Sequence, residues 1–329
     1  MIYDSVSLDW SERRYHTYLE QTKNEMDSEF SNLFRKVAHL RLNEKIVYVL
    51  KTRGKLLRPT LVLLSGQSVG ADREPLKKLA LAVELLHEAT LVHDDILDND
   101  SFRRNAIAVH AKWGVRDAIL VGDALASLST DFATEYGKEI TKVFSQTCLL
   151  LCDGECIDVL SECVGLSEND YFEKIMKKSA SLFSAATLCG AIAGGGSPLE
   201  HDCLAIFGEN FGLAYQIRDD LSDITPLREG TTPKLNDLQT LPMIHLNSTA
   251  SNLEKNLIQS FLSEKTEDGS KLKVTPEKLY ECLENAGSIA YCNERINDYV
   301  NRAVASLEPL KKSVYKSYLI KIADSIRIR

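Results

Sequence analysis

The chain has 329 residues, of which 44% are hydrophobic and 26% are charged, as in an ordinary globular protein. Its formal net charge of −8 argues against a basic surface for nucleic acid, so any functional positive charge must be local. Residues 181–196, the most apolar stretch, are too few to span a bilayer, and no signal-peptide pattern opens the chain. We therefore expect a cytoplasmic protein without a transmembrane segment, with peripheral membrane contact left open.

Apolar residues recur at helical spacing from Ser11 onward, whereas strand-like alternation is nearly absent. This pattern predicts an all-α fold in one large helical domain over residues 1–329, because no linker rich in Pro, Gly or Ser divides the chain. The predicted helices are 60–69, 74–98, 115–136, 139–164, 169–193 and 199–224, and the C-terminal part, 276–328, is again predicted to be helical. The segments between them are predicted loops, with residues 264–273 forming a charged surface insertion.

The same acidic pattern, Asp-Asp-x-x-Asp, occurs in two of the predicted helices. The two copies are Asp94-Asp95-Ile96-Leu97-Asp98 and Asp219-Asp220-Leu221-Ser222-Asp223. On a helix, residues four apart share a face, so the first and last Asp of each copy point the same way. Such like charges repel one another unless a cation lies between them, and hard divalent metals prefer oxygen ligands. The sequence therefore predicts a Mg²⁺ site for a diphosphate substrate.

Cationic side chains lie near the first acidic motif in the sequence. His87 precedes Asp94 by two helical turns, Arg103 and Arg104 follow in the next loop, and Lys55 and Arg58 lie in an upstream loop. Arg and Lys donors on loops suit a diphosphate group. We therefore expect a second anionic substrate, held directly by cations beside the metal site.

With these motifs in this order, the chain resembles the trans-isoprenyl diphosphate synthases, or polyprenyl synthetases. The similarity covers about residues 51–244 and includes G-K-L-L-R-P, E-L-L-H-E-A-T-L-V-H-D-D-I-L-D-N-D, R-R, V-G-D, G-E, Y-Q-I-R-D-D-L-S-D and T-L-P-M-I. It implies an all-α bundle of the isoprenoid synthase type, usually a homodimer, with both acidic motifs facing a central cavity. It also implies head-to-tail condensation of isopentenyl diphosphate with an allylic diphosphate, with three Mg²⁺ ions that Mn²⁺ can replace.

The resemblance implies a role for each matching residue. Asp94, Asp98 and Asp219 would bind the metal ions, and Asp95, Asp220 and Asp223 would act as partial or supporting ligands. The isopentenyl diphosphate would be held by Lys55, Arg58, His87 and Arg104. The allylic diphosphate would be held by Arg103 and Lys178, with Ser179 beside them and Gln216 near the reacting carbons. Metal and cations would stabilise the departing diphosphate, and the double bond of isopentenyl diphosphate would attack the allylic cation.

Three departures from the family pattern stand out. Arg53 replaces the first Gly of Gly-Gly-Lys, and Arg103-Arg104-Asn105-Ala106-Ile107-Ala108 replaces R-R-G-x-P-T. The Gly-Lys that normally precedes T-L-P is missing from Asn236-Asp237-Leu238-Gln239-Thr240. Lys234 is a candidate to replace that lysine in the allylic site.

Small residues before the first motif bear on product length. In this family the position five before the motif often forms the floor of the product cavity, and here it is Ala89, followed by Thr90. Leu86 and residues 127–130 would line deeper layers. An open floor favours a C25–C50 product, whereas a simple close contact between helices would leave a short-chain farnesyl or geranylgeranyl diphosphate synthase.

Two other functions stay open. A class I terpene cyclase shares the metal-triggered ionisation, but the set of Lys55, Arg58 and His87 argues against it. A non-catalytic partner subunit of a synthase would suit the missing Gly-Lys, although such subunits tend to lose the acidic motifs that this chain keeps. The eight cysteines, including Cys148, Cys152 and Cys156 on one helical face, are predicted to pack in the core rather than bind metal or form disulfides.

Overall fold

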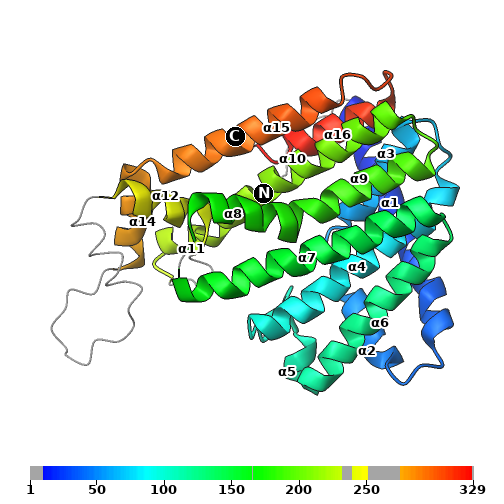
Figure 1. The fold of residues 1–329 in the computed structure, drawn as a ribbon, viewed down its shortest axis with the longest axis horizontal. Coiled ribbons are helices and arrows are strands. Elements are labelled where there is room, and N and C mark those ends of the chain that lie inside the picture. The colour runs from blue at the N-terminus through cyan, green and yellow to red at the C-terminus, as the bar shows by residue number, and fades with distance from the viewer. Residues whose placement is uncertain (1–9, 165, 232–238, 251–274, 328–329) are drawn as a thin grey trace, which may run out of the picture. The chain divides into compact units, whose positions relative to one another are not determined.

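The computed structural model describes residues 10–164, 166–231, 239–250 and 275–327. The predicted all-α fold is confirmed, because most of the described residues are helical and the only strands among them are two short ones (Figure 1). The chain divides into two compact units. The first contains the described residues up to Ser145, Ala185–Leu204 and Pro309–Leu319, and the second contains the rest.

Most helices and both strands lie wholly within either the first or the second unit. The first unit contains α1 (Trp10–Val37), α2 (Asn43–Lys51), α3 (Leu57–Ser68), η1 (Glu74–Leu76), α4 (Lys77–Leu97), β1 (Phe102–Arg103), β2 (Ala106–Ile107), α5 (Val109–Trp113) and α6 (Val115–Thr134). The second contains α8 (Glu168–Ile175), η2 (Met176–Ala180), α11 (Thr225–Arg228), α12 (Leu241–Thr249), α14 (Pro276–Asn285) and α15 (Ser288–Ser306). Residues of both units occur in α7 (Lys138–Val164), α9 (Ser181–Ala193), α10 (Pro198–Asp223) and α16 (Val314–Asp324).

Helix α4, which carries the first acidic motif, lies in the core of the first unit and packs on α1, α3 and α6. Small side chains allow α4 and α6 to approach closely: a Cβ atom at Gly122 would overlap the His93 ring. The buried Ser129 hydroxyl donates to the Ala82 carbonyl at 2.7 Å. These contacts fix α4 along its length, so its C-terminal carboxylates are held on a rigid element.

Two segments contain secondary structure that the sequence did not predict. The predicted loop 99–108 contains an antiparallel hairpin in which Phe102 pairs with Ile107 and Arg103 with Ala106. The predicted helix 169–193 is interrupted by η2, a π-helical turn. Neither feature has a strong local signal, because the hairpin has two residues per strand and a π-turn keeps helical periodicity.

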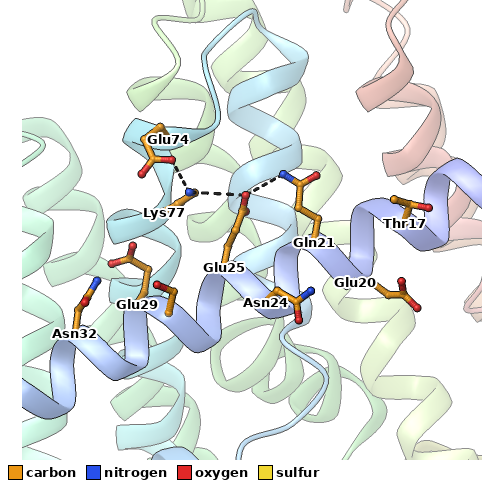
Figure 2. A pocket seen from close by; sticks show the side chains of 10 residues that line it. Thr17, Glu20, Gln21, Asn24, Glu25, Glu29, Asn32, Glu74 and Lys77 are labelled. Carbon is orange, nitrogen blue, oxygen red and sulfur yellow. Dashed lines mark hydrogen bonds and ion pairs between the residues drawn. The ribbon is translucent and has the colours of Figure 1, made fainter.

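An open groove of about 580 Å³ runs along α1 in the first unit (Figure 2). Its lining is polar and includes the acids Glu20, Glu25, Glu29 and Glu74 together with Lys77. None of the predicted site residues lines this groove. Among the described residues, no helix is long and apolar enough to cross a membrane.

The prediction that cysteines pack in the core holds for Cys189, Cys203, Cys282 and Cys292, which are buried. It is wrong for Cys152 and Cys156, whose side chains are exposed on α7, while Cys148 is half-buried. Spacing of four correctly predicted a shared helical face, but spacing alone does not say whether that face is covered.

Candidate functional site

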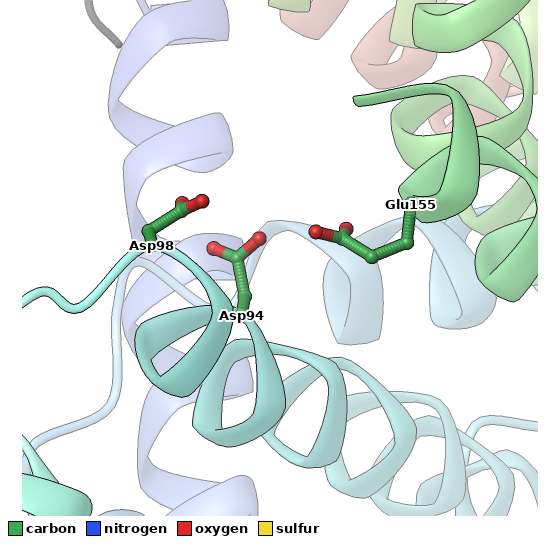
Figure 3. A group of neighbouring side chains, drawn as sticks. All are labelled: Asp94, Asp98 and Glu155. Atoms are coloured by element: carbon green, nitrogen blue, oxygen red, sulfur yellow. The ribbon is translucent and has the colours of Figure 1, made fainter. Parts of the chain in front are cut away.

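The carboxylates of the first acidic motif meet at the end of α4. An oxygen of Asp94 and an oxygen of Asp98 lie within 4.8 Å of each other, and Figure 3 shows both side chains on the same side of the helix. Both are half-buried, whereas Asp95 is buried. The predicted common face of Asp94 and Asp98 is therefore present, and its donors are carboxylate oxygens of the kind that Mg²⁺ prefers.

Arg103 binds the first acidic motif directly. Its guanidinium lies 2.6 Å from a carboxylate oxygen of Asp95 and 3.1 Å from one of Asp94. Burial raises the pKa of Asp95, although the Arg103 charge opposes that shift. Arg103 thus neutralises part of the acidic motif.

The hairpin turn explains how the sequence departs from the family pattern around Arg103. Arg104 and Asn105 both have positive φ angles, of 51° and 64°. A two-residue hairpin turn of type I′ requires positive φ at both positions, and Asn tolerates it better than most residues. The turn keeps both arginines beside α4 without the usual Gly.

Arg58 and His87 form the centre of the predicted cationic pocket. A guanidinium nitrogen of Arg58 lies 3.0 Å from His87 Nε2. Because arginine only donates, Nε2 must accept, which assigns the imidazole proton to Nδ1. Burial and the charge of Arg58 hold the pKa of His87 well below its usual range, so the ring is neutral. His87 therefore orients Arg58.

Lys55 lies on the exposed loop just before α3, next to a strained backbone position. Leu56 has φ 56° and ψ 38°, a left-handed conformation that costs a non-glycine residue about 1–2 kcal/mol. The buried Leu56 side chain holds this turn in place. Such strain concentrates at functional sites, and here it lies between Lys55 and Arg58 in the chain.

Two buried acids, Glu84 and Glu88, complete this cluster and were missed by the sequence analysis. Both lie on α4 with exposures of 2% and 3%, and Glu88 forms an ion pair with Arg104 at 2.7 Å. Burial, together with the neighbouring Glu88, raises the pKa of Glu84 to about 8. Glu84 and Glu88 are four residues apart and therefore share a helical face, and Glu88 is next to His87, a predicted site residue. This spacing could have indicated from the sequence that both acids belong to the cluster.

The raised pKa of Glu84 predicts a pH-dependent stability. Between its ordinary value of 4.5 and about 8, the folded protein keeps a proton that the unfolded chain releases. As the pH rises through this range, the free energy of unfolding of wild type should therefore fall, relative to that of Glu84→Gln, by up to about 1.4 kcal/mol per pH unit. Above pH 8 the difference should be constant. Urea unfolding of both proteins at pH 5, 7 and 9 measures it, and parallel pH profiles would refute the assignment.

The second acidic motif, on α10 in the second unit, has three different environments. Asp219 is half-buried, Asp223 is exposed, and Asp220 is 4% exposed. Asp220 accepts hydrogen bonds from the Tyr171 hydroxyl at 2.6 Å and from the Leu241 backbone N–H at 3.1 Å. Burial raises the pKa of Asp220 although these donors oppose the shift. Asp220 thus connects α10 with α8 and α12.

Gln216 belongs to the same network in the second unit. Its amide oxygen accepts from the Ser179 hydroxyl at 2.7 Å, and its amide nitrogen donates to Asp220 at 3.0 Å. Because both ends of the amide have partners, its orientation is fixed. Ser179, predicted beside the allylic diphosphate, and Gln216, predicted near the reacting carbons, are in contact with each other as part of this network.

Lys178 lies in the π-helical turn η2 and faces acids of α7. Its ammonium group is 2.9 Å from Glu155, which Figure 3 also labels, and 2.7 Å from Asp158. Although burial opposes it, Lys178 and its neighbour Lys174 lower the pKa of Asp158. A Cβ atom at Gly154 would lie 2.5 Å from the Lys178 backbone nitrogen, so only glycine permits this approach. Lys178 is therefore held in place by the fold.

The residues predicted to set product length lie around the middle of α4. Ala89 and Leu86 are buried, and Thr90 is half-buried with its hydroxyl bound to the His87 carbonyl. Residues 127–130, predicted to line deeper layers of the product cavity, lie on α6, where Ser129 is buried and Ser127 and Thr130 are exposed. Lys234 lies outside the described residues.

The chain is similar to known proteins over most of its length. A sequence profile for the family described as Polyprenyl synthetase matches residues 39–279. A short chain isoprenyl diphosphate synthase of Methanothermobacter thermautotrophicus is 36% identical over 290 residues, 85% of this chain and 87% of the relative. A geranylfarnesyl diphosphate synthase of Methanosarcina mazei is 35% identical over 64% of this chain and 70% of its own. The crystal structure of a geranylgeranyl pyrophosphate synthetase from Pyrococcus horikoshii has a TM-score of 0.83 at 28% identity, covering 96% of this chain and 99% of its own.

Proposed function

The chain belongs to the polyprenyl synthetase family and is a prenyl-transferring enzyme, and on this premise we propose that it joins isopentenyl diphosphate to an allylic diphosphate, head to tail. The observation that carries the proposal lies within the first unit. The paired carboxylates of Asp94 and Asp98 lie at the C-terminal end of helix α4. His87 lies two turns before Asp94 on the same helix, where it contacts Arg58. Arg104 contacts α4 through Glu88. This arrangement supports one diphosphate held through metal and one held by cations.

We propose Mg²⁺ as the cofactor, with Asp94 and Asp98 of the first motif and Asp219 of the second as ligands. These side chains fit, since all offer carboxylate oxygens and none of the three is deeply buried. When bound, Mg²⁺ would act as a Lewis acid that makes the allylic diphosphate a better leaving group. The proposal includes three ions and replacement by Mn²⁺.

The protein's own cations would hold and orient the two substrates. Lys55, Arg58 and Arg104 would bind the isopentenyl diphosphate, with His87 fixing Arg58. Arg103 and Lys178 would bind the allylic diphosphate and exchange their carboxylate partners for phosphate oxygens. The allylic C–O bond breaks and its electron pair leaves with the diphosphate. The double bond of isopentenyl diphosphate supplies the electron pair of the new C–C bond, and the released diphosphate takes the proton.

For the product, we propose a chain of C25 to C50, supported by the small side chain of Ala89 and by the geranylfarnesyl relative. A second candidate is a C20 or shorter product, which the 36% identity to a short-chain synthase favours. Incubation of the purified protein with Mg²⁺, isopentenyl diphosphate and each primer from C5 to C20, with mass spectrometry of the products, tests both. No elongation with any primer would refute the proposed function.

Enlarging Ala89 should shorten the product. In Ala89→Phe, the ring would occupy the floor of the product cavity, and we expect the longest product to lose at least one C5 unit while isopentenyl diphosphate is still consumed. Ala126→Phe, on the half-exposed side of α6, is the matched control and should leave the product distribution unchanged. An unchanged product from Ala89→Phe would show that Ala89 is only a contact between helices.

We further propose a cytoplasmic homodimer. Exposed apolar side chains on α6, such as Ile119 and Leu120, and on α7, such as Leu149, support an interface between copies. The seven cysteines whose side chains the structure describes carry free thiols, which suits a reducing compartment. A light-scattering mass equal to the 36.8 kDa of one chain would contradict the dimer, and recovery from an exported fraction would contradict the location.

A further inference from the structure

Glu88 is a buried carboxylate that the proposed reaction does not use. It lies in the middle of α4 with 3% exposure, and its oxygen is 2.7 Å from Nη1 of Arg104. A buried carboxylate is costly unless it is paired and hydrogen-bonded, and removal of its partner leaves a large penalty. The ion pair therefore holds the Arg104 guanidinium firmly against α4.

Through Arg104, Glu88 also fixes the segment that leads to Lys55. The same Nη1 donates to the Thr52 carbonyl at 3.3 Å. The guanidinium lies against Gly54, because a Cβ atom there would come within 2.9 Å of Nη2 and 3.2 Å of Nε. Arg104 thus connects three parts of the first unit: α4, the β1–β2 hairpin and the loop before α3.

The space beside this ion pair is too small for a substrate. A cavity of about 20 Å³ lies among the end of α2, α4 and the hairpin, and Thr52, Glu88 and Arg104 are among its lining residues. That volume admits about one water molecule but no diphosphate. The side of Arg104 that faces Glu88 is therefore a structural contact, and a diphosphate must approach the guanidinium from another side.

We propose that Glu88 is a positioning residue that seats Arg104, and with it residues 52–55, for binding of isopentenyl diphosphate. This inference rests on the proposed function, since it takes Arg104 to bind that substrate. An alternative role for Glu88 predicts the opposite change in affinity for isopentenyl diphosphate. If the Glu88 carboxylate mainly repelled the incoming anion, its removal would tighten binding rather than weaken it.

The test measures binding without turnover. Isothermal titration of isopentenyl diphosphate into the purified full chain, with no allylic substrate present, gives Kd for wild type, Glu88→Ala and Glu88→Gln. We expect Glu88→Ala to bind about tenfold more weakly, because the anchor of Arg104 is lost. Glu88→Gln keeps an acceptor and should stay within about threefold of wild type. Asp72→Asn, which changes an exposed acid outside this cluster, is the charge control and should match wild type at pH 7.

A second variant disturbs the position of the Arg104 guanidinium from the side of Gly54 instead of the side of Glu88. In Gly54→Ala the new methyl group displaces the flexible end of Arg104, so binding should weaken by a similar factor. The double variant Glu88→Ala/Gly54→Ala should bind no more weakly than the weaker single variant, because both changes disturb one contact. If Glu88→Ala fails to fold, Gly54→Ala decides the question.

The outcomes separate the two proposals. Wild-type or tighter affinity in Glu88→Ala, with wild type binding normally, would overturn the role of Glu88 and leave the proposed function intact. An equal loss of affinity for Mg²⁺ with geranyl diphosphate would also overturn it, since that indicates general disruption. Failure of wild type itself to bind isopentenyl diphosphate would remove the proposed function, and the inference with it.

Discussion

Replacing Asp94 and Asp98 together by Asn is expected to lower kcat for prenyl transfer by at least about a thousandfold. The two carboxylates share one face of α4, and neutral amides in their place bind a hard divalent cation much more weakly. Initial rates with Mg²⁺ and saturating substrates measure the loss. The protein should remain folded, because the substitution removes a repulsion between like charges at a helix end.

A thermal readout makes this prediction independent of catalysis. Mg²⁺ together with diphosphate should raise the Tm of wild type by more than diphosphate alone, since a ligand stabilises only the state that binds it. The double variant should lose this Mg²⁺-dependent part of the shift. Asp72→Asn, an exposed acid in the turn before η1, serves as the charge control and should behave as wild type in both assays. Wild-type rates and a wild-type shift in Tm in the double variant would rule out this metal site.

Asp220→Ala is expected to lower the free energy of unfolding by about 3–5 kcal/mol. The substitution removes the common acceptor of the Tyr171 hydroxyl, the Gln216 amide and the Leu241 backbone N–H, and leaves the buried donors of Tyr171 and Leu241 unsatisfied. Urea denaturation followed by circular dichroism measures the change. Turnover should fall as well, because Gln216 loses the partner that fixes its amide.

Asp223→Ala is the matched control on the same helix. Its side chain is exposed, so the free energy of unfolding should change by no more than about 0.5 kcal/mol. The two variants thus separate members of one acidic motif by their surroundings. Equal stability of Asp220→Ala and Asp223→Ala would show that the Asp220 network contributes nothing to the folded state.

Most helices could be predicted from periodicity alone. The predicted helix 115–136 corresponds to α6 (Val115–Thr134), and 199–224 to α10 (Pro198–Asp223). Helical periodicity reflects which residues are buried, and it persists over many turns, so long helices are well specified locally. The π-turn at Met176–Ala180 and the short hairpin at 102–107 depend on contacts with Gly154 and α4, which no local pattern shows.

In the candidate site, too, some features could be predicted from the sequence and others depend on tertiary contacts. The sequence by itself determined the family, the two acidic motifs and the order of the cations, because each is a set of chemical groups at fixed spacing. Only the tertiary structure decided which side chains meet: Arg103 with Asp94 and Asp95, Arg104 with Glu88, and Asp220 with Tyr171. Spacing along one helix fixes which residues share a face, but burial and partners depend on distant residues, such as Tyr171, which is 49 positions from Asp220 in the chain. Those long-range contacts, set by packing, make Asp220 a structural acid while Asp219 of the same motif stays half-buried.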